Sequence, residues 1–435
     1  RSPFRISSQD DLLNVDQLAD EFGTTYYFLQ TDNIEISASN WFVNGKYTTL
    51  DMSGIYDGGN NEIKISESLV GTVNVPYITL FNPKGDVVIK NLKTCSSANC
   101  LISICFADYS RNLKLENISA YSENDTIVQV SGSNAGPLVN THVYPNYYGY
   151  DDFSITIDNC HVNLKLNNSG DCTGVFIGGD VDFGKDCKNG AEIQILNSSF
   201  TGTIQSGHAG LIFGNGYSIK TDGVVEKIKS QLIVSNVVNN GVFRSTSTSD
   251  ATMFGVNNAR TRELHEYFSQ YITGSSTYTK YVNVLENVSN VNVYKQGDSY
   301  TVAGDGLSNN YTYRLALTTT ILADDQTEYS GRNIMVPLEF QSEALSTGNL
   351  KVGGIYLEAD ARAQGIIPAD SVLDYDHIYD AIFTISLYVD SNNNLYIIMK
   401  DPGESGYPKP QNNIFKMNLF AYDAEGYLVG RVAVK

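Results

Sequence analysis

The run Gly174-Val175-Phe176-Ile177-Gly178-Gly179 decides the fold of this chain, and Gly210-Leu211-Ile212-Phe213-Gly214 repeats its pattern 36 residues later. In both, a short apolar run stops at glycine, which is typical of brief strands that turn a corner and not of helices. Similar runs occur at Gly136-Pro137-Leu138-Val139 and Met253-Phe254-Gly255-Val256. The chain therefore contains a repeated unit of short strands.

A second pattern alternates with these runs: an apolar residue, a variable residue and an asparagine. The triplets are spaced by 26, 42, 38, 39 and 51 residues and end at Asn91, Asn117, Asn159, Asn197, Asn236 and Asn287. A period of this size is typical of a solenoid. Asparagine tolerates the left-handed backbone conformation that a sharp corner requires, and stacked asparagines can hydrogen-bond one another.

We therefore predict an all-β chain that begins with a right-handed parallel β-helix, a solenoid with an internal ladder of these six asparagines. Their side chains are expected to point inward. An antiparallel sandwich is the alternative, and it would require hairpin turns between the strands.

Composition limits the classes of function. The net charge of −19 disfavours binding to nucleic acid or to an anionic membrane. No apolar run reaches the length of a membrane span. Because the chain begins at Arg1 and not at Met, we expect that a leader segment has been removed.

All the cysteines lie in the first half of the chain, at Cys95, Cys100, Cys105, Cys160, Cys172 and Cys187. An even number in a chain rich in Tyr, Asn and Ser points to disulfides and an oxidising compartment. The alternative is six small buried hydrophobic residues. No pair has the CxxC spacing of a zinc site and the histidines show no metal spacing, so the sequence does not predict thiolate metal binding.

Three domains are predicted along the chain. Residues 1–25 hold a capping helix, which begins at Ser8 and presents Leu12, Val15 and Phe22 on an apolar face. Residues 26–295 form the β-helix with loop insertions, one of which reads as a helix over 258–271. From residue 296 the apolar residues alternate over longer runs separated by turn signals, which predicts an antiparallel β-sandwich over 296–435.

The opening part of the chain resembles bacterial and protist surface proteins that carry GLUG repeats. The resemblance rests on the helix, on the strand pair Tyr26–Ser37, on Trp41, on the turn Tyr56–Ile63, and on Asn-Cys or Asn-Ser corners after the glycine runs. It covers roughly residues 4 to 293. It implies a β-helix in a secreted or surface-exposed protein, often adhesive, and carries over no catalytic residues.

Fragments of a polysaccharide hydrolase pattern are present. They are Asn124-Asp125-Thr126, Asp151-Asp152, Gly207-His208-Ala209-Gly210 and Ile219-Lys220, which resemble the signatures of polygalacturonase-like enzymes. An inverting glycosidase needs two carboxylates roughly 6.5–9.5 Å apart. Here the first motif is scrambled, Ala209 breaks the third and the fourth lacks its arginine, so no catalytic residues are predicted.

Two loops are candidates for binding. Tyrosine rings can stack on sugars while neighbouring acids accept hydrogen bonds from sugar hydroxyls, and this chemistry is offered by Tyr144, Tyr147, Tyr148, Tyr150, Asp151 and Asp152. The alternative is a loop that packs its own tyrosines onto the solenoid. Asp180, Asp182 and Asp186 are spaced as in a calcium loop, but the glycine is early and the bidentate Glu is missing.

We accordingly expect a non-enzymatic structural or adhesive protein of an extracellular surface, such as a cell coat, filament or virion. The β-helix would be a rigid spacer and the sandwich would mediate assembly or attachment. The alternative is a pectinase-like hydrolase or lyase on a β-helix. We expect self-association or lattice contacts and glycan partners, no nucleic acid, no membrane insertion, and no cofactor unless Ca²⁺ binds the aspartate loop.

Overall fold

The computed structural model describes most of the chain, which divides into two compact units with the main boundary between Tyr281 and Val282. The described residues are 3–16, 26–36, 42–43, 46–47, 49–65, 78–98, 100–107, 112–130, 132–140, 153–181, 191–217, 219–220, 222–247, 249–296, 299–322, 328–337, 339–340, 350–375, 377–379, 383–400, 409–410 and 416–434. The prediction of an all-β chain is confirmed, since strands dominate and the largest sheet is parallel.

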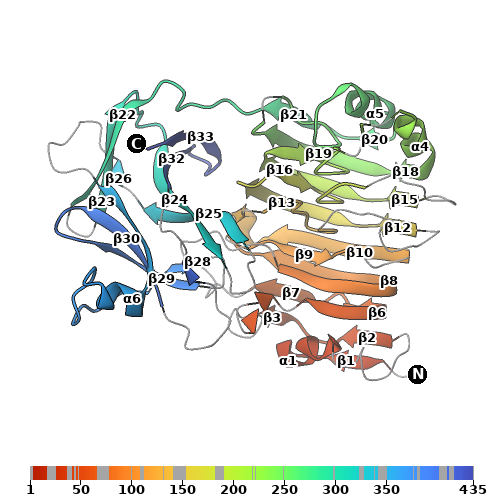
Figure 1. Ribbon diagram of the computed structural model, residues 1–435. Coiled ribbons are helices and arrows are strands. Elements are labelled where there is room, and N and C mark those ends of the chain that lie inside the picture. Colours follow the sequence, from red (N-terminus) through yellow and green to blue (C-terminus); the bar gives the residue numbers. More distant parts are fainter. Residues whose placement is uncertain are drawn as a thin grey trace. The chain divides into compact units, whose positions relative to one another are not determined.

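The first unit is a stack of parallel strands (Figure 1). We call one passage of the chain through the stack a layer. The first strands of successive layers pair with one another in register, and they are β1 (Phe4–Ile6), β2 (Tyr26–Gln30), the later part of β6 (Leu50–Asp57), the middle of β8 (Ile78–Ser96), the early part of β10 (Asn112–Ser122), β12 (Phe153–Asp158), β15 (Ala191–Leu196) and β18 (Leu232–Ser235).

One column of apolar residues holds these first strands together. Each member is the register partner of the next, and the column runs through Phe4, Phe28, Tyr56, Ile89, Leu115, Ile157, Ile195 and Val234. All but the outermost, Phe4, are buried. Burying each such side chain stabilises the fold by about 1.5–3 kcal/mol. The apolar position of the sequence triplet is therefore a core position.

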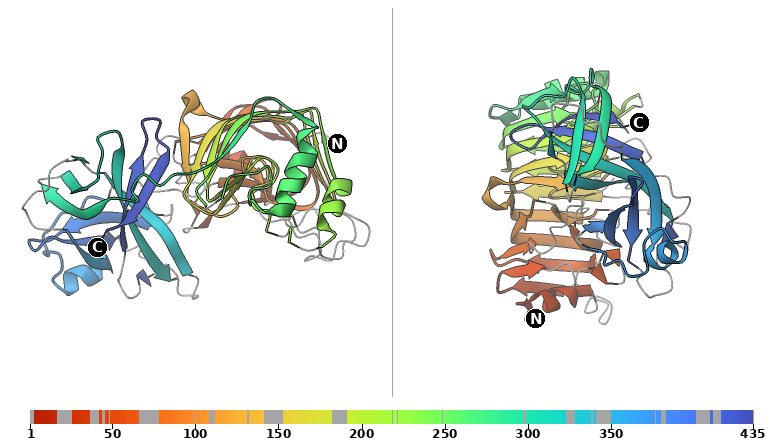
Figure 2. Two further views of the ribbon diagram at one scale, coloured as in Figure 1. Left: turned by 90° about the horizontal axis from the view of Figure 1, so that it is seen from above. Right: turned by 90° about the vertical axis from the view of Figure 1, so that its left-hand side faces the viewer.

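The second strands of the layers follow a corner and form a parallel series of their own. They include β3 (Ile34–Ile36), β7 (Glu62–Ile65), the later parts of β8 and β10, β11 (Ile127–Val130), β13 (His161–Asn168), β16 (Ser199–Ser206), β19 (Val237–Ser245), β20 (Ile272–Thr273) and β21 (Thr277–Lys280). Seen along the stack, the layers overlie one another (Figure 2).

Asparagines in the left-handed conformation form the corners between the first and second strands, at Asn60, Asn91, Asn117, Asn159, Asn197 and Asn236. Neighbouring layers are joined through these side chains: Asn159 donates to Asn117 over 3.2 Å and Asn236 to Asn197 over 2.9 Å. The expectation that these side chains point inward is wrong. Asn159, Asn197 and Asn236 are exposed at the outside of the corner.

Two further findings correct the predicted ladder. Asn197 donates to Asp158 over 2.9 Å and not to Asn159, whose Oδ1 contacts Nε2 of His161 over 3.1 Å. Asn287 lies in the second unit, just before β22, and the left-handed conformation there belongs to Asn290. The chain has left the stack at that point, so Asn287 has no neighbouring layer.

The glycine-flanked runs form the third side of each layer. Bridges between parallel segments stack Cys105, Val139, Ile177 and Phe213, all buried, and β14 (Cys172–Gly174) pairs in parallel with β17 (His208–Gly210). A Cβ on Gly174 would lie 2.0 Å from the carbonyl oxygen of Ile177 and 2.5 Å from the amide of Gly214. Glycine is needed there because the corner brings two backbones together.

Helices lie at the edges of the first unit. Helix α1 (Gln9–Leu13) is capped by Ser8, packs against β1 and β3 and buries Leu12, while the predicted residues 17–22 lie outside the described chain. Helix α5 (Ala259–Ser269) occupies the predicted insertion, capped by Asn258 with Leu264 and Phe268 buried. Helix α4 (Val224–Gln231), which we did not predict, lies beside α5 (Figure 2).

The described residues of the second unit form three small sheets around a common core that includes Val302, Leu315, Ile355, Ile397 and Leu419. Its strands are β22 (Ser289–Gln296), β23 (Ser299–Asp305), β24 (Thr312–Leu322), β25 (Glu328–Pro337), β26 (Glu339–Phe340), β27 (Lys351–Leu357), β28 (His377–Tyr379), β29 (Phe383–Val389), β30 (Asn394–Met399), β31 (Lys409–Pro410), β32 (Lys416–Tyr422) and β33 (Leu428–Ala433).

The sequence predicts antiparallel pairing throughout the second unit, but two of its strand pairs are parallel. Strand β27 pairs with β30 in parallel, and β23 with β26. Helix α6 (Glu358–Ala363) directly follows β27 and packs against both β27 and β30, so the chain leaves and re-enters this sheet by a long connection. None of the described helices in either unit is long and apolar enough to cross a membrane.

Candidate metal centre

A tight turn after β13 presents Asp171 and Cys172. Buried Asn168 shapes this turn, because its Oδ1 accepts hydrogen bonds from the amides of Gly132 and Gly170 at 3.1 and 2.9 Å. Its Nδ2 donates to the carbonyl oxygens of Gly132 and Cys172 at 2.9 and 3.2 Å, and to Oγ1 of Thr173 at 3.0 Å. One buried amide thus fixes the backbone that carries both side chains.

The next layer brings His208 onto the same site. Cys172 and His208 are register partners in the parallel pair of β14 and β17, and the amide of His208 donates to the carbonyl oxygen of Asp171 over 2.6 Å. A Cβ on the preceding Gly207 would lie 2.4 Å from that same oxygen. Glycine at position 207 therefore allows the two layers to approach closely enough for their side chains to meet.

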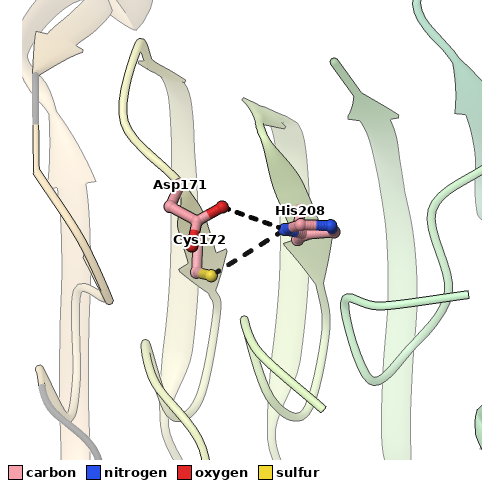
Figure 3. Close-up of side chains that lie close together, drawn as sticks. All are labelled: Asp171, Cys172 and His208. Atoms are coloured by element: carbon pink, nitrogen blue, oxygen red, sulfur yellow. Dashed lines mark hydrogen bonds and ion pairs between the residues drawn. The ribbon is translucent and has the colours of Figure 1, made fainter. Parts of the chain in front are cut away.

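Three different donor atoms converge in this cluster (Figure 3). Nδ1 of His208 lies 3.2 Å from Oδ1 of Asp171 and 4.0 Å from Sγ of Cys172. The ligand atoms of the three residues all lie within 4.8 Å of one another. Cys172 is fully buried, whereas the side chains of His208 and Asp171 are 13% and 59% exposed, so the cluster is open to solvent on the Asp171 side.

The electrostatic setting of Cys172 favours the protonated thiol over the thiolate. Burial is the largest cause that raises the pKa of Cys172, and the negative charges of Asp171 and Asp180 raise it further. A thiol with a raised pKa is a poor nucleophile, because the thiolate is the reactive form. The cluster is therefore unsuited to cysteine nucleophilic catalysis.

The geometry of the cluster also argues against cysteine nucleophilic catalysis. In a nucleophile–His–Asp triad, the two ring nitrogens of the histidine serve different partners. Here Asp171 and Cys172 both contact Nδ1 of His208. Two acidic groups that share one ring nitrogen cannot act as orienting group and nucleophile together. Carboxylate, thiolate and imidazole are, however, the three ligand types that Zn²⁺ takes in proteins.

An aromatic residue and a cation lie next to the cluster. The ring of Tyr217 meets that of His208 edge-on, with centroids 5.5 Å apart, and Nζ of Lys220 lies 4.5 Å from the centroid of the Tyr217 ring. Burial, followed by the charge of Asp171, raises the pKa of Tyr217. Tyr217 is 40% exposed and covers one side of the imidazole.

The predicted binding residues lie elsewhere or outside the described chain. Of the predicted calcium ligands, Asp182 and Asp186 lie outside the described residues, while Asp180 is buried and its Oδ1 accepts from the amide of Val181. The aromatic loop also lies outside them, with Tyr144, Tyr147, Tyr148, Tyr150, Asp151 and Asp152.

The described hydrolase fragments have separate partners. Asp125 forms an ion pair with Lys165 at 2.6 Å, His208 contacts Asp171, and Lys220 lies over Tyr217. The described cysteines, Cys95, Cys100, Cys105, Cys160 and Cys172, are all free and buried. For these five, the alternative of small buried residues is the one observed.

Sequence reasoning singled out His208 but missed Asp171 and Cys172. Spacings such as CxxC describe ligands that lie close together in the sequence, whereas these ligands come from adjacent layers. The signal that was available is the repeat itself: Gly170-Asp171-Cys172 and Gly207-His208 each follow a second strand, and Cys172 and His208 are 36 residues apart. That spacing is close to the 38-residue step of the neighbouring corner asparagines.

Comparison with known proteins adds no assignment. No protein-family model, no curated protein and no solved structure matches the chain.

Proposed function

We propose that this chain is a non-enzymatic structural or adhesive protein of an extracellular surface, similar to surface proteins with GLUG repeats. In this proposal the first unit is a right-handed parallel β-helix that acts as a rigid spacer. The second unit is a β-sandwich that mediates assembly or attachment. The observation that carries the proposal is the continuous apolar column of the first unit, in register from Phe4 to Val234.

A column of this kind supports a mechanical role. Each layer packs mainly on its neighbours, so length is added without a larger core. The stack resists bending because its strands are paired along it. Hydrogen bonds between corner side chains, such as Asn236 to Asn197 at 2.9 Å, add a second connection between layers. Such a stack suits a spacer that holds a second unit away from a surface.

An exposed tyrosine just after the end of α5 supports self-association. Tyr271 is 42% exposed and contacts the ring of Tyr267, with centroids 5.8 Å apart. Tyrosine is enriched at protein interfaces because it supplies a large contact area together with a hydroxyl. In the second unit, Val372 is 97% exposed on the connection after α6. These two sites are the first we would test as contact points between copies.

The polysaccharide hydrolase alternative has weaker support. Its described acid, Asp125, is held in an ion pair with Lys165, and its histidine contacts Asp171 and Cys172. A glycosidase requires one carboxylic acid and one carboxylate on opposite sides of the scissile bond. The described fragments do not form that arrangement.

Sedimentation velocity of the full-length chain over a concentration series tests the proposal. We expect reversible self-association that Tyr271→Ala or Val372→Asp weakens. Tyr27→Ala is the matched control, because Tyr27 is 37% exposed and lies on β2, at the other end of the stack from α5. A chain that stays monomeric throughout, and that releases reducing ends from a polysaccharide panel in an Asp125- or Asp152-dependent manner, would instead establish the hydrolase.

A further inference from the structure

We propose that Asp171, Cys172 and His208 bind one divalent transition-metal ion of the zinc type, with water completing its coordination. The site goes beyond the structural function proposed above and does not depend on it. It differs from the predicted calcium loop in its residues and in the metal it favours.

The choice of ion follows from the donor atoms. Thiolate and imidazole suit Zn²⁺ and its neighbours in the transition series, whereas Ca²⁺ and Mg²⁺ take oxygen ligands. Only Asp171 offers oxygen in this cluster. A carboxylate and a thiolate beside a neutral imidazole carry two negative charges, which one divalent cation balances. A thiol that coordinates a metal ion loses its proton, so Cys172 would bind as the thiolate.

The distances fit a tetrahedral ion with small side-chain adjustments. Bonds of about 2.0–2.3 Å place tetrahedral ligand atoms roughly 3.3–3.8 Å apart. Nδ1 of His208 already lies 3.2 Å from Oδ1 of Asp171 and 4.0 Å from Sγ of Cys172. All three ligand atoms lie within 4.8 Å of one another, so small rotations of the Asp171 and Cys172 side chains would bring them to these separations.

The backbone around the cluster is preorganised. Asn168 fixes the turn that carries Asp171 and Cys172, and β17 holds His208 opposite Cys172 by parallel pairing. A preformed site loses little conformational entropy when the ion binds. Because the ligands come from two layers, the ion would also connect those layers.

Cys172 differs from the other cysteines whose contacts are known. The thiols of Cys100, Cys105 and Cys160 meet backbone carbonyl oxygens, as buried cysteines in a packed core do. Cys172 instead meets the ring nitrogen of His208, with Asp171 beside both. Core packing alone explains the contacts of Cys100, Cys105 and Cys160. It does not explain why the thiol of Cys172 lies beside an imidazole and a carboxylate.

Cobalt titration of the reduced, chelator-treated full-length chain tests the site. Thiolate-to-cobalt charge transfer and tetrahedral cobalt bands should appear with one ion per chain, and Zn²⁺ but not Ca²⁺ should abolish them. Cys172→Ser should remove the charge-transfer band, while His208→Gln and Asp171→Asn should each weaken binding at least about tenfold. Zn²⁺ should also raise the Tm of the native chain and not that of Cys172→Ser.

Matched variants control for the other thiols and histidines. Cys160→Ser removes another buried thiol and His161→Gln another histidine that contacts a serine and an asparagine, and both should bind cobalt as the native chain does. Circular dichroism without metal reports whether each variant folds. If Cys172→Ser does not fold, the cobalt affinity of His208→Gln tests the site instead, and an unchanged affinity would overturn the proposal. A charge-transfer band that survives Cys172→Ser, disappears in Cys187→Ser, or never forms in the native chain would overturn the proposal.

Discussion

The side chain of Asn117 donates a hydrogen bond of 2.8 Å to Asn91, which lies 26 residues earlier, and both residues adopt left-handed backbone conformations with φ of 54° and 52°. The same amide lies 3.4 Å from Oδ1 of Asn60, and its own Oδ1 accepts from Asn159. One asparagine therefore serves a corner and links several layers. Its two roles can be separated by mutation.

Replacing Asn117 by alanine should destabilise the first unit by roughly 2–3 kcal/mol. The left-handed conformation costs alanine about 1–2 kcal/mol, whereas the short polar side chain of asparagine offsets this cost by local hydrogen bonding, and the lost hydrogen bonds add about 1 kcal/mol. Asn117→Gly keeps the backbone conformation and should lose only the hydrogen-bond contribution. Urea denaturation measures both free energies of unfolding. Equal losses in the two variants would show that the left-handed corner is not what requires asparagine.

Replacing Gly174 by alanine should destabilise the same unit by about 3 kcal/mol or more, because the new Cβ meets backbone atoms that cannot rotate away. Its nearest neighbours would be the carbonyl oxygen of Ile177 at 2.0 Å and the amide of Gly214 at 2.5 Å. Gly85→Ala is the matched control, since its Cβ would meet only Ser53 at 3.9 Å, and it should change stability by less than about 0.5 kcal/mol. Thermal unfolding of the two variants distinguishes these outcomes.

Asn168→Asp should destabilise the turn of the candidate metal centre by about 3 kcal/mol although it changes only one atom of the side chain. The amide nitrogen now donates to Gly132, Cys172 and Thr173, and a carboxylate would place an unpaired negative oxygen against two carbonyls. Asn163→Asp, at an exposed position of the same strand, should be nearly neutral. Urea denaturation measures the difference, and comparable losses in both variants would contradict the role given to Asn168.

Stability should fall as the pH drops below about 6.5, in part because of His265. Burial is the larger effect and lowers the pKa of this imidazole, while the charge of Glu266 opposes it. The folded chain therefore binds its proton less readily than the unfolded chain, so this contribution is present above the unfolded pKa and is lost as the pH falls through it toward the folded pKa. For one proton, the slope is at most about 1.4 kcal/mol per pH unit.

His265→Gln should flatten this part of the pH dependence. In the native chain, Nδ1 of His265 accepts from the amide of Met253 over 3.2 Å, and the ring meets Tyr278 edge-on. Glutamine can still accept that hydrogen bond but does not titrate. Urea denaturation at about pH 7.5 and about pH 5.5 compares the variants, with His161→Gln as the control at an exposed histidine. An unchanged slope in His265→Gln would assign the acid sensitivity to other groups.

Much of the architecture could be read from local sequence, because its causes are local. Ile157 and Ile195 precede their corner asparagines by two residues, and alternation alone places such residues on the buried face of a strand. The left-handed conformation of Asn159 and Asn197 also follows from residue type, since asparagine adopts it at lower cost than most residues with a Cβ. Helix α4 was missed although Val224, Val225 and Ile228 repeat with helical spacing.

The sequence by itself determined the strand-forming repeat, its corner asparagines and the glycines at Gly174 and Gly210, because each depends on the chemistry of one or a few neighbouring residues. Only the tertiary structure decided that the asparagine side chains face outward, that Asn197 pairs with Asp158, and that Asp171, Cys172 and His208 meet. These contacts depend on the register between layers. Loops of unequal length conceal that register in the sequence, and backbone pairing across layers sets it in the fold.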